Sequence, residues 1–221
     1  MVRAVWGGPR GGGAHHGPAS QTGAEADPRP MHAMSAVVLD TNLSLDGLAA
    51  AAGITETQPL GVGGERLPAW ARGPGADRTP KPPATAGALV CGRRTYDLAL
   101  PAWGSGGPHP PTPVFVITHA APDAPPPDSV YTFVTDDVEA AVEQASAAAG
   151  ARDVRIMGGA DIGQQCLDAG LVDEIVVHLV PVLLKDGLPM FANLGPNHIE
   201  LDIVEVVESD DVTHLRYRVR R

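Results

Sequence analysis

The feature that most constrains the fold of this chain is a series of short apolar segments, each of which begins or ends at turn residues. The segments lie at 36–42, 87–91, 114–118, 130–134 and 154–157. Apolar runs of this length are typical of β-strands. A strand that is apolar along its whole length has no face suited to water, so it needs cover on both sides. We therefore expect a sheet that lies between two layers.

Two helical segments support parallel connections between strands. Residues 137–149 carry apolar side chains at helical spacing and end before Gly150, which suits the position after a helix. Asp136 is the expected N-cap, with Glu139 as its partner in a capping box. Residues 160–169 form the second expected helix, directly after an apolar strand. A strand, a helix and a further strand in succession predict a unit whose strands run parallel.

The C-terminal part of the chain changes to alternation. Residues 173–183 predict a long strand, and apolar and polar side chains then alternate at 198–207 and at 212–219. Alternation with a period of two is typical of antiparallel strands that have one solvated face. The sequence thus predicts an α/β fold of three layers, with a mainly parallel mixed sheet and a C-terminal antiparallel hairpin.

Residues 1–33 are rich in Gly and Pro and show neither a helical nor a strand period. Such a composition buries too little apolar surface to offset the entropy that is lost when a chain becomes ordered. We therefore predict a disordered N-terminal extension at 1–33 and one folded domain at 34–221.

Charge and composition limit the kinds of partner. Acidic residues outnumber basic residues 26 to 16, and the formal net charge of −10 disfavours binding to nucleic acid. No apolar run approaches the roughly 18–20 residues that span a bilayer, so we expect a cytoplasmic protein without a membrane partner. The two cysteines, Cys91 and Cys166, fit neither a disulfide framework nor a metal site, and no metal is expected.

Ligands in such sheets bind beyond the carboxyl ends of strands, where one strand-to-helix junction carries two arginines. The sequence Gly92-Arg93-Arg94-Thr95 places both cations in the first turn of a helix. The N-terminus of a helix already has positive potential, so two cations there are unfavourable unless an anion binds beside them. The junction therefore indicates a phosphate site. The alternative is that both side chains extend into solvent.

At a second junction, an apolar strand ends in Gly158 and Gly159 at the start of a helix. Glycines lack a Cβ atom, so the backbone can adopt strained angles here and approach a flat or phosphorylated ligand closely. The pattern is neither the dinucleotide-binding fingerprint nor a P-loop. An ordinary turn is the alternative interpretation of this pair.

Several motifs, taken in order, resemble those of a known family. They are Asn42-Leu-Ser-Leu-Asp46-Gly47, Gly63-Gly-Glu65-Arg66-Leu67, Gly92-Arg93-Arg94-Thr95-Tyr96, Gly158-Gly159-Ala160, and Ala169-Gly-Leu-Val-Asp173-Glu174 followed by Val180-Pro181-Val182-Leu183. Over about residues 34–220 the chain resembles the dihydrofolate reductase-like superfamily. Within it, the chain is similar to relatives of the C-terminal reductase domain of the bacterial bifunctional riboflavin-biosynthesis deaminase-reductase. The resemblance implies an NADPH-dependent reductase that forms a homodimer.

The resemblance also implies which residues hold NADPH. The turn at Gly92, Arg93, Arg94 and Thr95 would hold the 2′-phosphate of the adenosine, and Thr118 would contact the adenosine half. The second turn, with Gly158, Gly159, Ala160, Asp161 and Ile162, would lie against the pyrophosphate and the nicotinamide. The charge argument at the two arginines independently favours an anion at the first turn.

Four polar residues are candidates for the substrate side. The resemblance implies Asp46 and Glu65 as catalytic acids; the alternatives are a residue that only shapes a turn and a first-turn glutamate favoured by the helix dipole. Asp40 is an expected substrate-binding residue, because an acid in a buried strand needs a partner or a ligand. His178 is the other, and a hydrogen-bonded core histidine is its alternative.

The resulting hypothesis is a reductase that passes hydride from NADPH to a small pterin-like or pyrimidine-like heterocycle. The riboflavin-pathway compound 5-amino-6-(5-phosphoribosylamino)uracil is one candidate substrate. The riboflavin reductases usually carry a glutamate immediately before the paired glycines, where this chain has Met157, and the sequence lacks the P-C-x-x-C zinc motif of the deaminase half. The alternative is a non-catalytic NADP-binding or regulatory protein of the same fold.

Overall fold

The computed structural model describes residues 35–73, 76–79 and 85–221, so the extension predicted at 1–33 lies outside the described residues. The strands are β1 (Val37–Ser44), β2 (Leu48–Ala51), β3 (Ala88–Gly92), β4 (Val114–Ile117), β5 (Tyr131–Val134), β6 (Val154–Met157), β7 (Glu174–Val180), β8 (Gly187–Pro189), β9 (Leu201–Glu208) and β10 (Thr213–Val219). The α-helices are α1 (Arg93–Trp103), α2 (Val138–Ala149) and α3 (Ala160–Asp168). Short 3-10 helices include η1 (Gly64–Arg66) and η2 (Ala69–Arg72).

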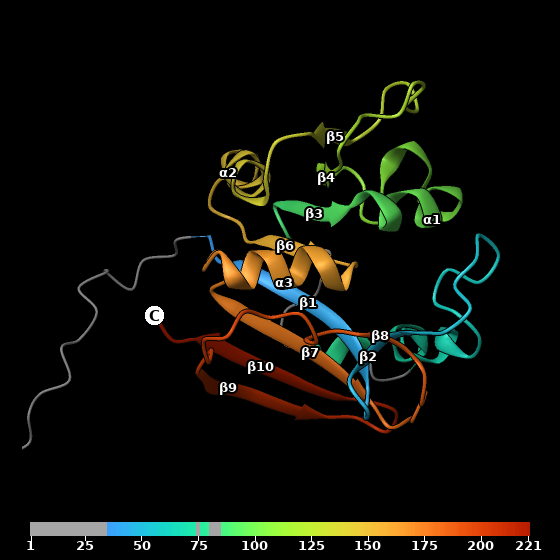
Figure 1. Ribbon diagram of the computed structural model, residues 1–221, viewed down its shortest axis with the longest axis vertical. Coiled ribbons are helices and arrows are strands. Elements are labelled where there is room, and N and C mark those ends of the chain that lie inside the picture. Colours follow the sequence, from blue (N-terminus) through green and yellow to red (C-terminus); the bar gives the residue numbers. More distant parts are fainter. Residues whose placement is uncertain (1–34, 74–75, 80–84) are drawn as a thin grey trace, which may run out of the picture. The chain divides into compact units, whose positions relative to one another are not determined.

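Within the described ranges, eight strands form one sheet in the order β5-β4-β3-β6-β1-β7-β10-β9 (Figure 1). The first six in this order run parallel, whereas β10 is antiparallel to both β7 and β9. Strands β2 and β8 form a separate antiparallel pair, which the sequence did not predict. The mainly parallel sheet and the C-terminal antiparallel hairpin are confirmed.

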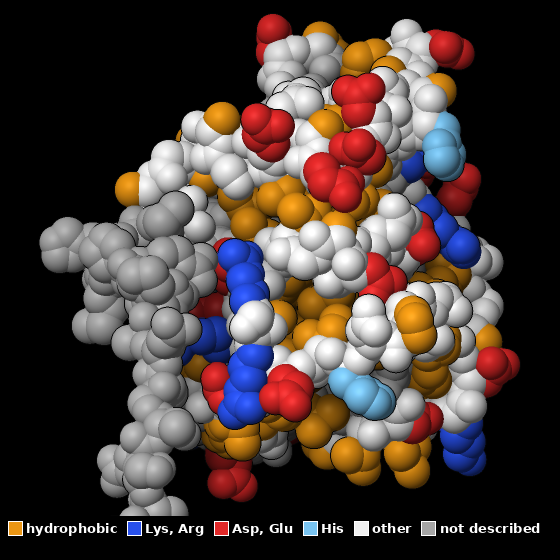
Figure 2. Space-filling view, turned by 60° about the vertical axis from the view of Figure 1, so that its left-hand side comes forward, with side chains coloured by type: hydrophobic (Ala, Val, Ile, Leu, Met, Phe, Trp, Pro, Cys, Tyr) orange, Lys and Arg blue, Asp and Glu red, His pale blue; other side chains and the backbone are white. Residues whose placement is uncertain are grey.

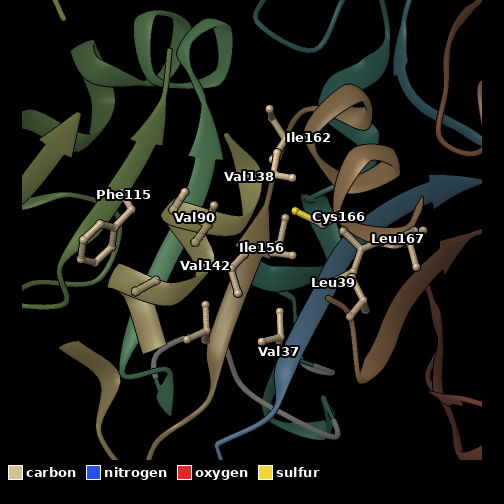
Figure 3. Packing of buried hydrophobic residues seen from close by; sticks show 14 of the residues in the cluster. Val37, Leu39, Val90, Phe115, Val138, Val142, Ile156, Ile162, Cys166 and Leu167 are labelled. Atoms are coloured by element: carbon tan, nitrogen blue, oxygen red, sulfur yellow. The ribbon is translucent and has the colours of Figure 1, made fainter. Parts of the chain in front are cut away.

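Helices cover both faces of the parallel strands, as the continuous apolar runs require. On one face α2 and α3 join the side chains of β1, β3 and β6 in the main core, where Val90 and Ile156 are fully buried (Figure 3). Burial of each such side chain contributes roughly 1.5–3 kcal/mol. On the other face α1 packs through Tyr96, whose ring centroid lies 4.9 Å from that of Tyr131. These layers confirm the predicted fold class.

The N-terminus of α2 corrects the prediction by one residue. Asp137, not Asp136, is the N-cap, because its carboxylate accepts a hydrogen bond of 2.8 Å from the N–H of Ala140. A capping box joins the N-cap to the third helical residue, which is Ala140 here, so Glu139 cannot complete one. The helix ends before Gly150, as predicted.

Strand β7 is shorter than the predicted strand at 173–183. It ends at Val180, since Pro181 has no N–H group with which to continue the ladder. The chain then turns back, and the N–H of Val182 bonds to the carbonyl of Val180 at 2.8 Å. Strand β1, in contrast, continues to Ser44, beyond the predicted segment at 36–42.

The edge strand β9 has two unlike faces. On one face its acidic side chains pair with arginines, as Asp202 does with Arg220. On the other face the register with β10 aligns Leu201, Ile203 and Val206, which are 38%, 71% and 56% exposed. Apolar side chains gather along the lower margin of the molecule in Figure 2. An exposed apolar edge of this kind is a site for pairing with another chain.

We expect a second copy of the chain to cover this apolar face of β9, because a symmetric partner hides the surface and protects the edge. Light scattering at micromolar concentration should give a mass near twice 22.8 kDa. The substitution Ile203→Arg should give a folded monomer, since the side chain is mostly exposed within a single chain. A wild-type protein that stays monomeric at these concentrations would contradict the expectation.

Candidate cofactor and substrate site

The sheet has a topological switch point between β3 and β6. These strands are parallel neighbours, but the chain leaves β3 through α1 toward β4 and leaves β6 through α3 toward β7, on the other side. The two connections diverge at the carboxyl ends of both strands, where we expect the crevice that is typical of such a switch point. Open α/β sheets bind their ligands at such a crevice.

The two junctions predicted from the sequence meet at this crevice. Gly158 and Gly159 have φ angles of 68° and 78°, in the left-handed region that favours glycine. A Cβ atom at Gly158 would lie 2.6 Å from Cγ2 of Thr95, and one at Gly92 would lie 2.9 Å from Cγ1 of Ile162. The absent side chains therefore allow the start of each helix to pack against the junction of the other.

Neither helix has a side-chain cap at its N-terminus. The N-caps of α1 and α3 are Gly92 and Gly159, so the first N–H groups of both helices are left for solvent or an anion. Ala160 is buried at the start of α3, whereas Asp161 is exposed and accepts a hydrogen bond of 2.8 Å from Nε2 of Gln165. The two N-termini thus form an electropositive floor for the crevice.

The two arginines at the first junction differ in their contacts. Nε of Arg93 donates to both carboxylate oxygens of Asp97, at 2.8 and 3.0 Å, and Nη1 donates to the carbonyl of Ala120 at 2.9 Å. The hydroxyl of Thr118 donates to the same carbonyl at 2.7 Å. Arg94 is exposed, and its side chain has no hydrogen bond or ion pair with any described residue. Arg93 is held in place, and Arg94 is open to a ligand.

Arg94 lines an open pocket of about 230 Å³. The remaining lining comes from the end of β2 and the start of β8: Ala51, Ala52, Gly53, Ile54, Asp186, Gly187 and Leu188. Arg94 directly precedes Thr95, which packs against Gly158. Small apolar groups with one charge of each sign suit a ligand that has an apolar body and an anionic group.

Asp40 lies at the base of the crevice, where its register partner in β6 is Met157. Its carboxylate forms a buried ion pair with Arg155, and Oδ1 lies 3.0 Å from Nε2 of His178. Burial acts to raise the pKa of Asp40, but the contacts with His178 and Arg155 outweigh it and lower that pKa below its usual value. The buried acid therefore has partners within the protein, and its role in substrate binding stays a prediction.

His178 and His214 form a buried pair whose Nδ1 atoms are 2.7 Å apart. Because Asp40 favours a proton on Nε2 of His178, its Nδ1 accepts a hydrogen bond from Nδ1–H of His214. Burial, and then the neighbouring His178, lowers the pKa of His214 to about 4. The ring of Trp70 lies 4.4 and 4.8 Å from the two imidazole centroids, and its Nε1–H donates to Asn42. The pair matches the core histidine considered as the alternative for His178, and Nε2 of His214 is buried without a hydrogen-bond partner among the described residues.

The two expected catalytic acids lie outside the pocket lining. Asp46 accepts hydrogen bonds from the backbone N–H groups of Leu184 and Lys185, at 3.2 and 2.7 Å. A hydrogen bond with Ser44 and these backbone bonds lower the pKa of Asp46. Glu65 is exposed in η1. Asp46 thus joins its turn to the segment after β7, and the catalytic roles of both acids stay predictions.

Sequence reasoning missed Arg155, His214 and Trp70. Arg155 is 1% exposed in the middle of β6, and a cation inside an apolar strand was the available signal that a buried acid lies opposite. His214 occupies a position that the alternation assigned to a solvated face. Trp70 lies in a segment without a helical or strand period, so only the tertiary structure places it.

The described ranges contain no group of three His, Cys, Asp or Glu side chains that could hold a metal ion. Burial raises the pKa of the Cys91 and Cys166 thiols to about 12. In the same part of the chain, no helix is long and apolar enough to cross a membrane.

Comparison with protein families gives one match that spans most of the chain. A family model described as the RibD C-terminal domain matches residues 35–215. No curated protein sequence matches the chain.

Solved structures with a similar fold include a protein of Shewanella sp. PV-4 that is assigned by its name to riboflavin biosynthesis. It is 24% identical with a TM-score of 0.62, over 84% of this chain and 99% of that chain. The diaminohydroxyphosphoribosylaminopyrimidine deaminase/5-amino-6-(5-phosphoribosylamino)uracil reductase of Thermotoga maritima is 16% identical with a TM-score of 0.61, over 84% of this chain and 57% of that chain. A pyrimidine reductase-like protein of Corynebacterium diphtheriae is 14% identical with a TM-score of 0.55, over 85% and 92%. At these identities the likeness shows a shared fold.

The buried histidine pair predicts how stability changes with pH. His214 has a folded pKa of about 4 and an ordinary value of 6.5, so between these pH values the unfolded chain binds a proton that the folded chain does not. Its contribution to stability should therefore be lost as the pH falls from 6.5 to 4, by up to about 3 kcal/mol. The stability that Asp40 contributes should be lost only as the pH falls below about 4, because its pKa in the folded chain lies below the ordinary value of 3.8.

Urea unfolding at pH 7 and at pH 4.5 measures this loss. In His214→Asn the amide nitrogen can replace Nδ1 as a donor without titrating, so this variant should lose less stability between about pH 7 and pH 4.5 than the wild type does. Equal losses in the two proteins would contradict the assignment.

Proposed function

The chain belongs to the RibD C-terminal domain family, and from that premise we propose that it is an NADPH-dependent reductase of a small heterocyclic substrate. The family is the pyrimidine reductase domain of RibD, which implies an oxidoreductase. The observation that carries the proposal is the contact between the turn at Thr95 and the paired glycines, at the switch point of the parallel sheet. That contact joins two anion-binding helix N-termini in one crevice.

The residues at this crevice fit a dinucleotide. A Cβ atom at Gly158 would clash with Thr95, so glycine at this position lets the start of α1 pack directly against the turn that opens α3. In the proposal, the α3 N-terminus at Gly159 and Ala160 holds the pyrophosphate. Arg94 lines the open pocket and adds a charge-assisted contact to the same group. Arg93, which is joined to the loop after β4, holds the 2′-phosphate at the adenosine end.

The chemistry comes from the cofactor, since a bound NADPH supplies a hydride. The protein orients the two reactants. The pocket beside Arg94 is the proposed place for the acceptor, because its lining from β2 and β8 is mainly small and apolar. An apolar lining suits a flat heterocycle, and Arg94 could also contact a phosphate on it. A pterin or a pyrimidine, including 5-amino-6-(5-phosphoribosylamino)uracil, fits this description.

One observation favours a second candidate, a non-catalytic NADP-binding or regulatory protein of the same fold. Reduction of a C=N or C=O group needs a proton as well as a hydride. The acids near the crevice are engaged elsewhere: Asp40 pairs with Arg155, and Asp46 accepts backbone hydrogen bonds. Asp186 does line the pocket and is exposed, so it is the described carboxyl group best placed to pass a proton from water.

The first test separates the two arginines by titration calorimetry with NADPH and NADH. Arg93→Ala should weaken the binding of NADPH about tenfold more than the binding of NADH, because only NADPH carries the 2′-phosphate. A charge-assisted contact to a phosphate is worth roughly 1.5–3 kcal/mol before solvent screening. Arg94→Ala should weaken the binding of both cofactors to a similar extent, since both carry the pyrophosphate. If neither cofactor binds the wild-type protein, the proposed function is wrong.

The second test is turnover. Oxidation of NADPH, followed by its absorbance, should occur with at least one member of a panel of pterins and pyrimidines, and Asp186→Asn should lower kcat more than KM for NADPH. Tight binding of NADPH without turnover of any panel member would favour the non-catalytic candidate.

A further inference from the structure

The guanidinium group of Arg93 is held on two sides by other parts of the protein. Nε donates to both carboxylate oxygens of Asp97, one helical turn further along α1, and Nη1 donates to the carbonyl of Ala120. Arg93 is 37% exposed and Asp97 49% exposed, so the pair is reached by water and screened. An exposed pair of this kind contributes little to folding. Its effect lies in the orientation of the guanidinium.

The carbonyl that Arg93 meets is itself fixed to the sheet. The hydroxyl of Thr118 donates to Ala120 O at 2.7 Å and accepts from Ala120 N at 3.3 Å. The N–H of Thr118 bonds to the carbonyl of Val134 at 3.0 Å, which anchors the turn beside β5. The single hydroxyl hydrogen of Thr118 is therefore used within the protein. Thr118 acts on a ligand through Arg93 rather than by donating to it.

An arginine has five N–H donors in a planar fork. The contacts with Asp97 and Ala120 use the Nε hydrogen and one hydrogen of Nη1. Among the described residues, no acceptor lies within hydrogen-bond distance of Nη2, so this end of the fork remains for a ligand. A planar fork held at one side and open at the other matches bidentate recognition of a phosphate.

We propose that Asp97 and Thr118 are positioning residues that set the preference for NADPH over NADH, because they hold the Arg93 fork toward the adenosine 2′-phosphate. Neither touches the cofactor. The inference rests on the proposed function, in which Arg93 contacts that phosphate. It also runs against simple charge counting, since a carboxylate beside a phosphate site repels the phosphate.

Two variants at residue 97 separate positioning from charge. Asp97→Asn keeps an oxygen that accepts from Nε of Arg93 and removes the repulsion, so its preference for NADPH should equal or exceed that of the wild type. Asp97→Ala removes the acceptor and releases an arginine side chain with considerable rotamer freedom, so the preference should fall about fivefold. The measured quantity is the ratio of the Kd values for NADH and NADPH by titration calorimetry, which needs no turnover.

Other mechanisms give different patterns. If Asp97 acts only through its charge, Asp97→Ala and Asp97→Asn should both raise the preference for NADPH. If Asp97 only supports α1, Asp97→Ala should weaken both cofactors equally and lower the melting temperature. Either pattern would overturn the proposal.

Residue 118 and a double variant provide further tests. Thr118→Val keeps the shape but loses the hydroxyl, and should lower the preference for NADPH, whereas Thr118→Ser should preserve it. In an Arg93→Ala background, Asp97→Ala should have no further effect on the ratio, because Asp97 acts through Arg93. An effect that persists in that background would reject the mechanism.

The two proposals can fail separately. A wild-type protein that binds NADH as tightly as NADPH would remove the proposed cofactor preference and this inference with it. A wild-type preference that is lost in Arg93→Ala but unchanged in Asp97→Ala would leave the proposed function standing and reject the positioning role alone.

Discussion

Asp40 and Arg155 bring opposite charges into the buried centre of a largely apolar sheet. Removal of either partner would break a buried ion pair, which costs about 3–5 kcal/mol in comparable cases. The pair also sets the register of β1 against β6, because a slip of one residue would turn Asp40 to the face opposite Arg155. The register fixes the position of the end of β6, and so of Gly158, relative to β1. The geometry of the crevice therefore depends on an ion pair made within the sheet.

The charges around the crevice fall into two groups. Its acids are mostly engaged by the protein, as Asp40 is by Arg155 and Asp46 by backbone N–H groups. The helix N-termini and Arg94 have no such partners among the described residues. Positive groups thus stay available to a ligand here, although the chain carries a formal net charge of −10. The local field, rather than the net charge, determines which ligands this surface attracts.

The sequence predicted the strands and helices better than it predicted the contacts between residues distant in the chain. The apolar runs identified the central strands, since burial on both faces leaves a pattern that each strand carries by itself. The contact of Thr95 with Gly158 joins segments more than 60 residues apart, and nothing local to either segment encodes it. The same holds for Asp40, whose need for a partner could be read locally but whose partner, Arg155, could not. The error at Asp136 arose because two adjacent aspartates fit the same cap pattern.

Gly92 and Gly158 differ in how readily a larger residue could replace them during evolution or design. Gly92 has a φ of −84°, so only the space occupied by Ile162 opposes a larger residue there, and a smaller residue at position 162 would make room. Gly158 is restricted twice, by Thr95 and by its φ of 68°. Shrinking Thr95 would relieve the first restriction and leave the second, which costs about 1–2 kcal/mol for a residue with a Cβ atom. The crevice can therefore be reshaped from the α1 side, whereas the β6 side will accept little besides glycine.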